Sequence, residues 1–191
     1  MSKFKIILPL LVVVILSACG DKYEGDYSYK VGDFTFTNQD GEQVSKSDLE
    51  GKFWVVDFIF TNCTTVCPPM TSNMADLQKQ LKEAGLEEEV QLVSFSVNPK
   101  KDTPKILKDY AKARGGTFDN WHLLTGYEFE TIKELSIKSF KAAVEKIADS
   151  NQVMHSTRFF IVTPEGNAIK GYDGRDQANM EKIVQDIEDM S

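Results

Sequence analysis

The sequence contains few of the residues that most often bind metals, with three cysteines and two histidines among 191 residues. Structural zinc usually takes four protein ligands, so this small supply makes a zinc-stabilised fold unattractive. An apolar run of about 20 residues, long enough for a comfortable transmembrane helix, is also missing. The apolar run near the N-terminus, Ile6–Leu16, is much shorter.

Positive charge is scarce as well. The chain has 22 Lys and Arg against 29 Asp and Glu, which gives a formal net charge of −7. The sequence has no basic patch that could neutralise nucleic-acid phosphates or attract anionic lipid headgroups. We therefore expect no nucleic-acid partner, and any attachment to a membrane must come from a lipid.

The N-terminal residues have the pattern of a bacterial export signal, in which a basic start precedes a short apolar run. Leu16–Cys19 resembles a lipobox, where cleavage leaves a diacylated cysteine as the new N-terminus. We expect a signal peptide over residues 1–18 and lipidation at Cys19. A polar tether over residues 19–30 would then hold the protein on the extracytoplasmic face of the cell membrane. An ordinary signal peptide or an uncleaved anchor is the alternative.

The rest of the chain, residues 31–191, alternates strand and helix patterns and suits one domain. Strands are expected at Phe34–Thr37 and Gln43–Ser45, joined as a hairpin, and at Phe53–Phe60, Gln91–Val97, Trp121–Leu124, Arg158–Val162 and Ala168–Gly171. Helices are expected at Met70–Leu81, Pro104–Ala113, Phe129–Phe140 and Asn179–Met190, with Gly85 as a helix stop. This order predicts an α/β fold of the thioredoxin type, with a mixed central sheet, helices on both faces and an N-terminal β-hairpin.

Cys63 and Cys67 lie between the nearly all-apolar strand and the helix that follows it. Functional sites of open α/β sheets gather at this end of a strand. Pro68 and Pro69 can occupy the first helical positions, and the dipole and free N–H groups there favour a thiolate. With Cys19 lipidated, the two cysteines form an even pair in a compartment where disulfides can form.

Several chemistries are open to such a pair. Two thiolates and an imidazole suit a three-coordinate copper site, since soft sulfur binds Cu(I) and imidazole accepts Cu(II). Thiol–disulfide exchange and, less strongly, thiol peroxidase chemistry use the same cysteines, whereas a purely structural disulfide would close only a short loop. His122 lies beside residues that are expected to pack. Met70, Met74 and Met154 carry thioethers, but the first two have the spacing of a core-facing helix stripe.

Four sequence elements, in order, are similar to those of the Sco/SenC family of copper-binding proteins, and the likeness extends from about Val31 to the C-terminus. They are Phe60–Pro68 around the cysteines, Ser96–Pro99 with Asp102–Pro104, Leu124–Gly126, and Val153–His155. One departure is Asn98, where the family usually has aspartate, and this puts in doubt any role of that position in tuning a nearby thiol or metal.

The resemblance implies a thioredoxin-like metallochaperone that binds copper, Cu(I) or Cu(II), through Cys63, Cys67 and His155. It also implies a role in assembling the CuA centre of cytochrome c oxidase, with the CuA-bearing subunit as the partner and a thiol reductant as a further one. Such a protein is not a turnover enzyme in the strict sense. The alternative is an extracytoplasmic thiol–disulfide oxidoreductase that acts on partner cysteines.

Overall fold

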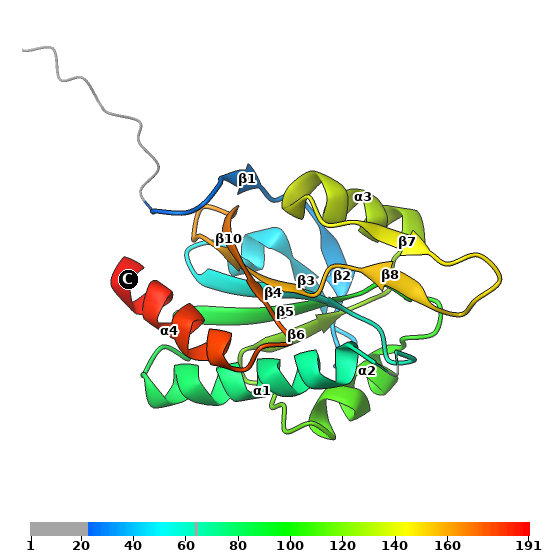
Figure 1. The fold of residues 1–191 in the computed structure, drawn as a ribbon, viewed down its shortest axis with the longest axis horizontal. Coiled ribbons are helices and arrows are strands. Elements are labelled where there is room, and N and C mark those ends of the chain that lie inside the picture. Colours follow the sequence, from blue (N-terminus) through cyan, green and yellow to red (C-terminus); the bar gives the residue numbers. More distant parts are fainter. Residues whose placement is uncertain (1–22, 64) are drawn as a thin grey trace, which may run out of the picture.

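The structure is a computed structural model that describes residues 23–63 and 65–191 (Figure 1). Its strands are β1 (Tyr29–Lys30), β2 (Thr35–Thr37), β3 (Gln43–Ser45), β4 (Phe53–Ile59), β5 (Val90–Ser96), β6 (Trp121–Leu124), β7 (Val144–Lys146), β8 (Val153–His155), β9 (Arg158–Val162) and β10 (Asn167–Asp173). Its helices are α1 (Cys67–Glu83), α2 (Pro104–Lys112), α3 (Phe129–Phe140) and α4 (Ala178–Met190), and a 3-10 turn, η1, covers Lys46–Leu49.

A six-stranded sheet of order β1-β10-β9-β4-β5-β6 forms the middle of the molecule. Strands β4, β5 and β6 run parallel, and β9, β10 and β1 join them in antiparallel pairs. Helices α1, α2 and α4 cover one face, while α3 and the β2–β3 hairpin cover the other (Figure 1). The prediction of a thioredoxin-like mixed sheet between helices is confirmed.

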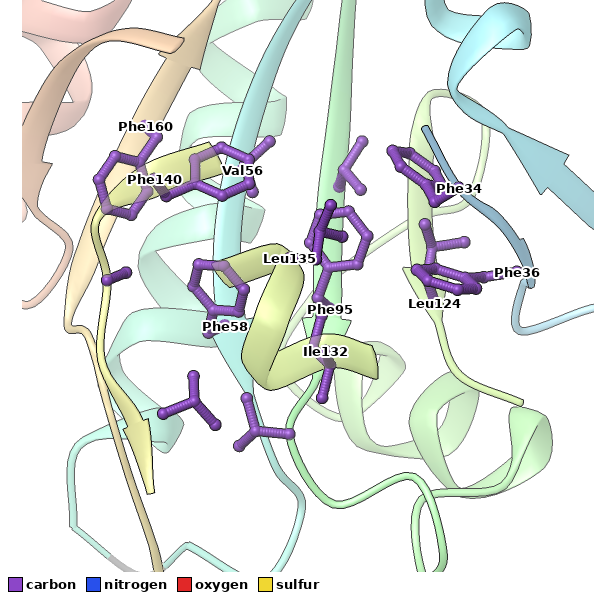
Figure 2. Packing of buried hydrophobic residues seen from close by; sticks show 14 of the residues in the cluster. Phe34, Phe36, Val56, Phe58, Phe95, Leu124, Ile132, Leu135, Phe140 and Phe160 are labelled. Carbon is purple, nitrogen blue, oxygen red and sulfur yellow. The ribbon is translucent and has the colours of Figure 1, made fainter. Parts of the chain in front are cut away.

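Strand β4 is almost entirely apolar in sequence because all seven of its residues are buried. Val55 and Ile59 pack in the cluster beneath α1 and α4, whereas Val56 and Phe58 pack on the α3 side. Figure 2 shows the α3 side, where aromatic rings from several elements meet over the sheet. Helices on both faces remove the polar alternation that a half-exposed strand would have.

The N-terminal hairpin is confirmed: β2 and β3 pair in antiparallel register, with Phe36 opposite Val44, and the residues between them are Asn38-Gln-Asp-Gly41 followed by Glu42. Its first strand also forms a bridge from Thr37 to Thr125, just beyond β6. The helix stop at Gly85 agrees as well, since its φ of 77° lies in the left-handed region that glycine tolerates best. Residues that favour turns therefore predicted both the hairpin and the end of helix α1 correctly.

The tether predicted over residues 19–30 is too long. Asp26 donates its N–H to the carbonyl of Ile169 at 2.9 Å, and Tyr29 pairs with Ala168 in β1. The last residues of the expected tether are thus part of the sheet edge. A two-residue strand has too little sequence to show a period, which is why this pairing was missed.

The signal peptide over residues 1–18 and the lipidated Cys19 lie outside the described residues. Within the described part of the chain, no helix combines the length and the apolar character needed to cross a bilayer. The short hairpin of β7 and β8 was also not expected from the sequence. It matters because β8 carries His155.

Candidate metal centre beyond strand β4

The two cysteines occupy the connection from β4 to α1. The N–H of Cys63 donates to the carbonyl of Phe60 at 3.3 Å, which turns the chain after the strand, and α1 begins at Cys67 itself. Pro68 and Pro69 follow directly and have no N–H to leave unpaired. The N–H of Cys67 is free to act outside the helix, and it points at Cys63 Sγ with a separation of 3.5 Å.

His155 reaches the cysteines from a distant part of the chain. Its Nε2 atom lies 3.1 Å from Cys67 Sγ, across 88 residues of sequence. Its Nδ1 atom lies 2.8 Å from the carbonyl oxygen of Ser156, which can accept a hydrogen bond but cannot donate one. Nδ1 therefore carries the proton, and Nε2 presents its lone pair towards the sulfur. The ring of Phe60 meets the imidazole edge to face and limits how it can turn.

The environment separates the two thiols electrostatically. Burial opposes ionisation of Cys63, but the adjacent His155 ring and the N–H groups of Cys67 and Thr65 outweigh it and lower its pKa to about 5. Burial raises the pKa of Cys67 far above its usual value, and the charge of Cys63 adds to this. Nε2 of His155 lies in direct contact with Cys67 Sγ, yet Cys63 is the cysteine whose pKa is lowered. The two thiols together therefore carry one negative charge near neutral pH, and this charge lies on Cys63.

The donor set fits a soft metal ion, because it consists of two thiols and an imidazole nitrogen whose other nitrogen is already fixed by a carbonyl. Both cysteines are free thiols, and both are buried. Among the described residues, however, no three His, Cys, Asp or Glu side chains already surround a common point closely enough to hold an ion.

Asp102 supports the cysteine connection, and the sequence pattern assigned it no such role. Its carboxylate accepts the Thr61 hydroxyl at 2.6 Å, the Thr61 N–H at 3.3 Å and the Ser96 hydroxyl at 2.6 Å. The side chain is fully buried. It ties the residue two positions before Cys63 to the end of β5, and it therefore anchors one side of the loop. The Asp-Thr-Pro element was visible in the sequence, but nothing local pointed to Thr61.

Asp57 is a second buried carboxyl, in the middle of β4. The hydroxyl of Ser94 donates to its Oδ1 atom at 2.5 Å, whereas its Oδ2 atom has no partner among the described residues. Burial raises the pKa of Asp57 to about 7, against the smaller effects of Ser94 and His155. A carboxyl inside an apolar strand was present in the sequence, but its missing partner could be seen only in three dimensions.

The other side chains considered from the sequence lie apart from the thiols. His122 lies in β6, where its Nε2 atom contacts Gln91 Oε1 at 3.1 Å, and burial lowers its pKa. Met70 and Met74 are completely buried on the inner side of α1, whereas Met154 is 53% exposed. Asn98 uses its backbone to shape the turn into α2: its carbonyl accepts the N–H of Asp102 at 3.0 Å.

Comparison with known proteins identifies the family to which a chain with this site is similar. The SCO1/SenC family model matches residues 24–191. A crystal structure of a SCO1/SenC family lipoprotein from Bacillus anthracis is 44% identical, with a TM-score of 0.80, and the match covers 85% of this chain and 95% of that one.

Two further solved structures are similar along most of their length. BsSco, described as a member of the Sco family of cytochrome c oxidase assembly proteins with a disulfide switch, is 45% identical, with a TM-score of 0.79 and coverage of 88% and 96%. ScoI from Arabidopsis thaliana with copper bound is 28% identical, with a TM-score of 0.69 and coverage of 83% and 98%. With its fold, its cysteine connection and a family match over nearly the whole described chain, this protein belongs to the SCO1/SenC family.

Proposed function

We propose that this protein is a metallochaperone that carries copper as cargo on Cys63, Cys67 and His155 and delivers it during assembly of the CuA centre of cytochrome c oxidase. The observation that carries the proposal is the 3.1 Å contact between Cys67 Sγ and His155 Nε2, with Nδ1 held by the Ser156 carbonyl. It places a thiol and an oriented imidazole lone pair together, next to a second thiol of low pKa. The copper-bound relative supports the identity of the cargo.

The cysteines must be reduced for this role, because a disulfide would remove both sulfur ligands. Copper binding then exchanges the Cys67–His155 contact for two bonds to the ion. The thiolate of Cys63 completes the proposed ligand set. The protein supplies soft ligands without the fourth ligand of a closed structural site, and such a site can also release its cargo to a partner.

Titration of the reduced full-length protein with Cu(I), in competition with a chromophoric chelator, tests the ligand set. The variant His155→Ala is expected to weaken copper binding by at least the 10–100-fold that loss of an outer-shell partner typically costs. His122→Ala is the matched control, since it removes the other histidine of the chain, and it should leave the affinity unchanged. Equal affinity of His155→Ala and wild type would contradict the proposed third ligand.

Delivery is tested in the cell. Deletion of the gene should lower cytochrome c oxidase activity, and added copper should restore part of it if the protein acts by supplying the metal. Restoration by added thiol reductant, but not by copper, would instead favour the second candidate function described next.

The second candidate is a thiol–disulfide oxidoreductase, and the observation that favours it is the pKa of about 5 at Cys63. The Cys63 thiolate would attack a partner disulfide, form a mixed disulfide and release one partner thiolate. Cys67 would then attack the Cys63 sulfur, which leaves the Cys63–Cys67 disulfide and a fully reduced partner. Cys67→Ser should trap the mixed disulfide. Absence of any trapped partner, together with tight copper binding, would exclude this candidate.

We also propose that Cys19 is lipidated and holds the protein on the extracytoplasmic face of the membrane. The lipobox-like segment Leu16–Cys19 supports this, as does the similar Bacillus anthracis protein, which is named a lipoprotein. Cys19→Ala should release the protein from the membrane fraction. Continued membrane association of that variant would contradict lipid anchoring.

A further inference from the structure

A groove of about 460 Å³ adjoins the candidate metal centre on the α3 side of the sheet. His155 and its neighbour Ser156 lie at the lining of this groove. The same two residues form the hydrogen bond that orients the imidazole. A molecule in the groove would therefore contact the metal centre from outside, without passing between the cysteines.

The walls of the groove are aromatic. Tyr27 and Tyr29 stack at a centroid separation of 4.8 Å on one side, and Phe140 and Phe160 lie 5.2 Å apart at the base. Met154 adds a thioether that is 53% exposed. Together with the tyrosines, this exposed apolar side chain continues the apolar lining up to His155.

The charge of the groove is opposite to that of the protein. Its lining includes Lys141 and Arg158 but no Asp or Glu, although the whole chain has a formal net charge of −7. Among the described residues, neither cation forms an ion pair with a carboxylate. Asp173, which lies opposite Arg158 in the sheet register, is bound by Arg175 at 2.6 Å, and Arg158 attracts it only through the weakest of the charge effects on its pKa.

Lys141 is held at the rim by two contacts that leave its charge uncompensated. Its Nζ atom donates to the Lys138 carbonyl at 3.0 Å and lies 5.0 Å from the centre of the Tyr29 ring. Asp26 lies outside the lining and acts on Tyr27 less strongly than burial and Arg158 do. The groove thus combines an apolar base with two cations at its edge that form no ion pair with a carboxylate among the described residues.

Resting on the proposed function, we infer that this groove docks an acidic segment of the copper-receiving protein, with carboxylates on Lys141 and Arg158 and an apolar side chain between the tyrosines and Met154. Charge complementarity selects this partner, because an acidic protein otherwise repels an acidic surface. Docking there holds the acceptor against His155. It also brings the acceptor to Ser156, whose carbonyl orients the ligand nitrogen.

The test measures binding of the full-length protein, in detergent, to the purified CuA-bearing domain of cytochrome c oxidase from the same organism. The double reversal Lys141→Glu with Arg158→Glu should weaken binding about tenfold or more, and added salt should weaken binding of the wild type. Lys79→Glu with Lys112→Glu is the matched control, because it changes the net charge equally at two exposed cations on helices of the opposite face. Met154→Ala should have a smaller effect in the same direction.

Copper titration of each variant separates this inference from the proposed function. If the groove variant binds copper as tightly as the wild type but binds the CuA-bearing domain more weakly, the inference is supported. If the wild type itself does not bind copper, the proposed function is wrong, and docking of the copper-free protein can still be measured. The inference is overturned if the groove reversal binds the domain as well as the wild type does, if the control weakens binding equally, or if the wild type does not bind. It is also overturned if the reversal instead abolishes self-association, since the occupant would then be a second copy of the chain.

Discussion

Two buried carboxyls, Asp57 and Asp102, are equally hidden from water but differ in their surroundings. The oxygens of Asp102, in the connection between β5 and α2, accept three hydrogen bonds from Thr61 and Ser96. Asp57, in the centre of the sheet, has one partner, Ser94, and an Oδ2 atom without any among the described residues. Burial raises the pKa of both.

The difference assigns them different tasks. A carboxylate that satisfies the donors of two segments fixes those segments, and its removal leaves the donors unpaired. A carboxylate with an unpaired oxygen is costly to ionise and stabilises little. Asp102 therefore belongs to the support of the cysteine connection, whereas Asp57 is a titratable group placed in the core.

The largest effect is expected for Asp102→Ala, which leaves the donors of Thr61 and Ser96 without their shared acceptor. The free energy of unfolding should fall by about 3–5 kcal/mol, measured by urea denaturation. Copper affinity should fall as well, because the residues before Cys63 lose their anchor.

Thr61→Val provides the graded comparison for Asp102→Ala. It removes the hydroxyl donor but keeps the backbone N–H and the side-chain shape, so the loss should be about 1–2 kcal/mol. If Asp102→Ala and Thr61→Val both left the free energy of unfolding nearly unchanged, Asp102 would not stabilise the loop, and the proposed difference between Asp102 and Asp57 would be wrong.

The next effect concerns Asp57 and depends on pH. Its pKa in the folded state, about 7, lies above its usual value of 3.8, so the folded protein binds this proton more tightly than the unfolded chain. The stabilisation is complete below about pH 4 and is lost as the pH rises to about 7, at up to about 1.4 kcal/mol per pH unit and about 4 kcal/mol in total.

The variant Asp57→Asn should lack this loss. We expect it to be more stable than the wild type at pH 8, with a flatter dependence of unfolding free energy on pH between about 4 and 7. A wild-type protein whose stability rises over this interval would show that Asp57 is ionised at little cost.

The smallest effect is spectroscopic. The ultraviolet absorbance of the thiolate should titrate with a midpoint near pH 5, owing to Cys63, while Cys67 remains protonated through neutral pH. Asp57→Asn should leave this midpoint nearly unchanged, because hydrogen bonds set the pKa of Cys63, whereas Asp57 acts on Cys67 by charge alone. Cys63→Ser should remove the transition. A transition that persists in that variant would assign the thiolate to the other cysteine.

Much of the fold followed from local patterns. The expected ranges for β5 and β6 and for α2 to α4 agree with the structure to within two residues. Those segments carry enough residues for an apolar period to be visible. Strands β1, β7 and β8 were missed because two or three residues show no period. For β1, the partner strand β10 also lies far away in the chain.

The site divides in the same way. Placement between a buried strand and a proline-initiated helix predicted that Cys63 and Cys67 are reactive thiols. No such local argument existed for His155, which was identified only through the resemblance of its short segment to a family motif. The roles of Asp102 and Asp57 depend on which donors face them, and these come from other strands and loops.

By itself, the sequence determined the order of strands and helices, the buried central strand and the reactive position of the two cysteines, since each depends on neighbours along the chain. Only the tertiary structure decided that Nε2 of His155 faces Cys67, that Asp102 anchors the loop and that a cationic aromatic groove adjoins the site. Those features depend on contacts between residues dozens of positions apart, and folding alone brings such residues together.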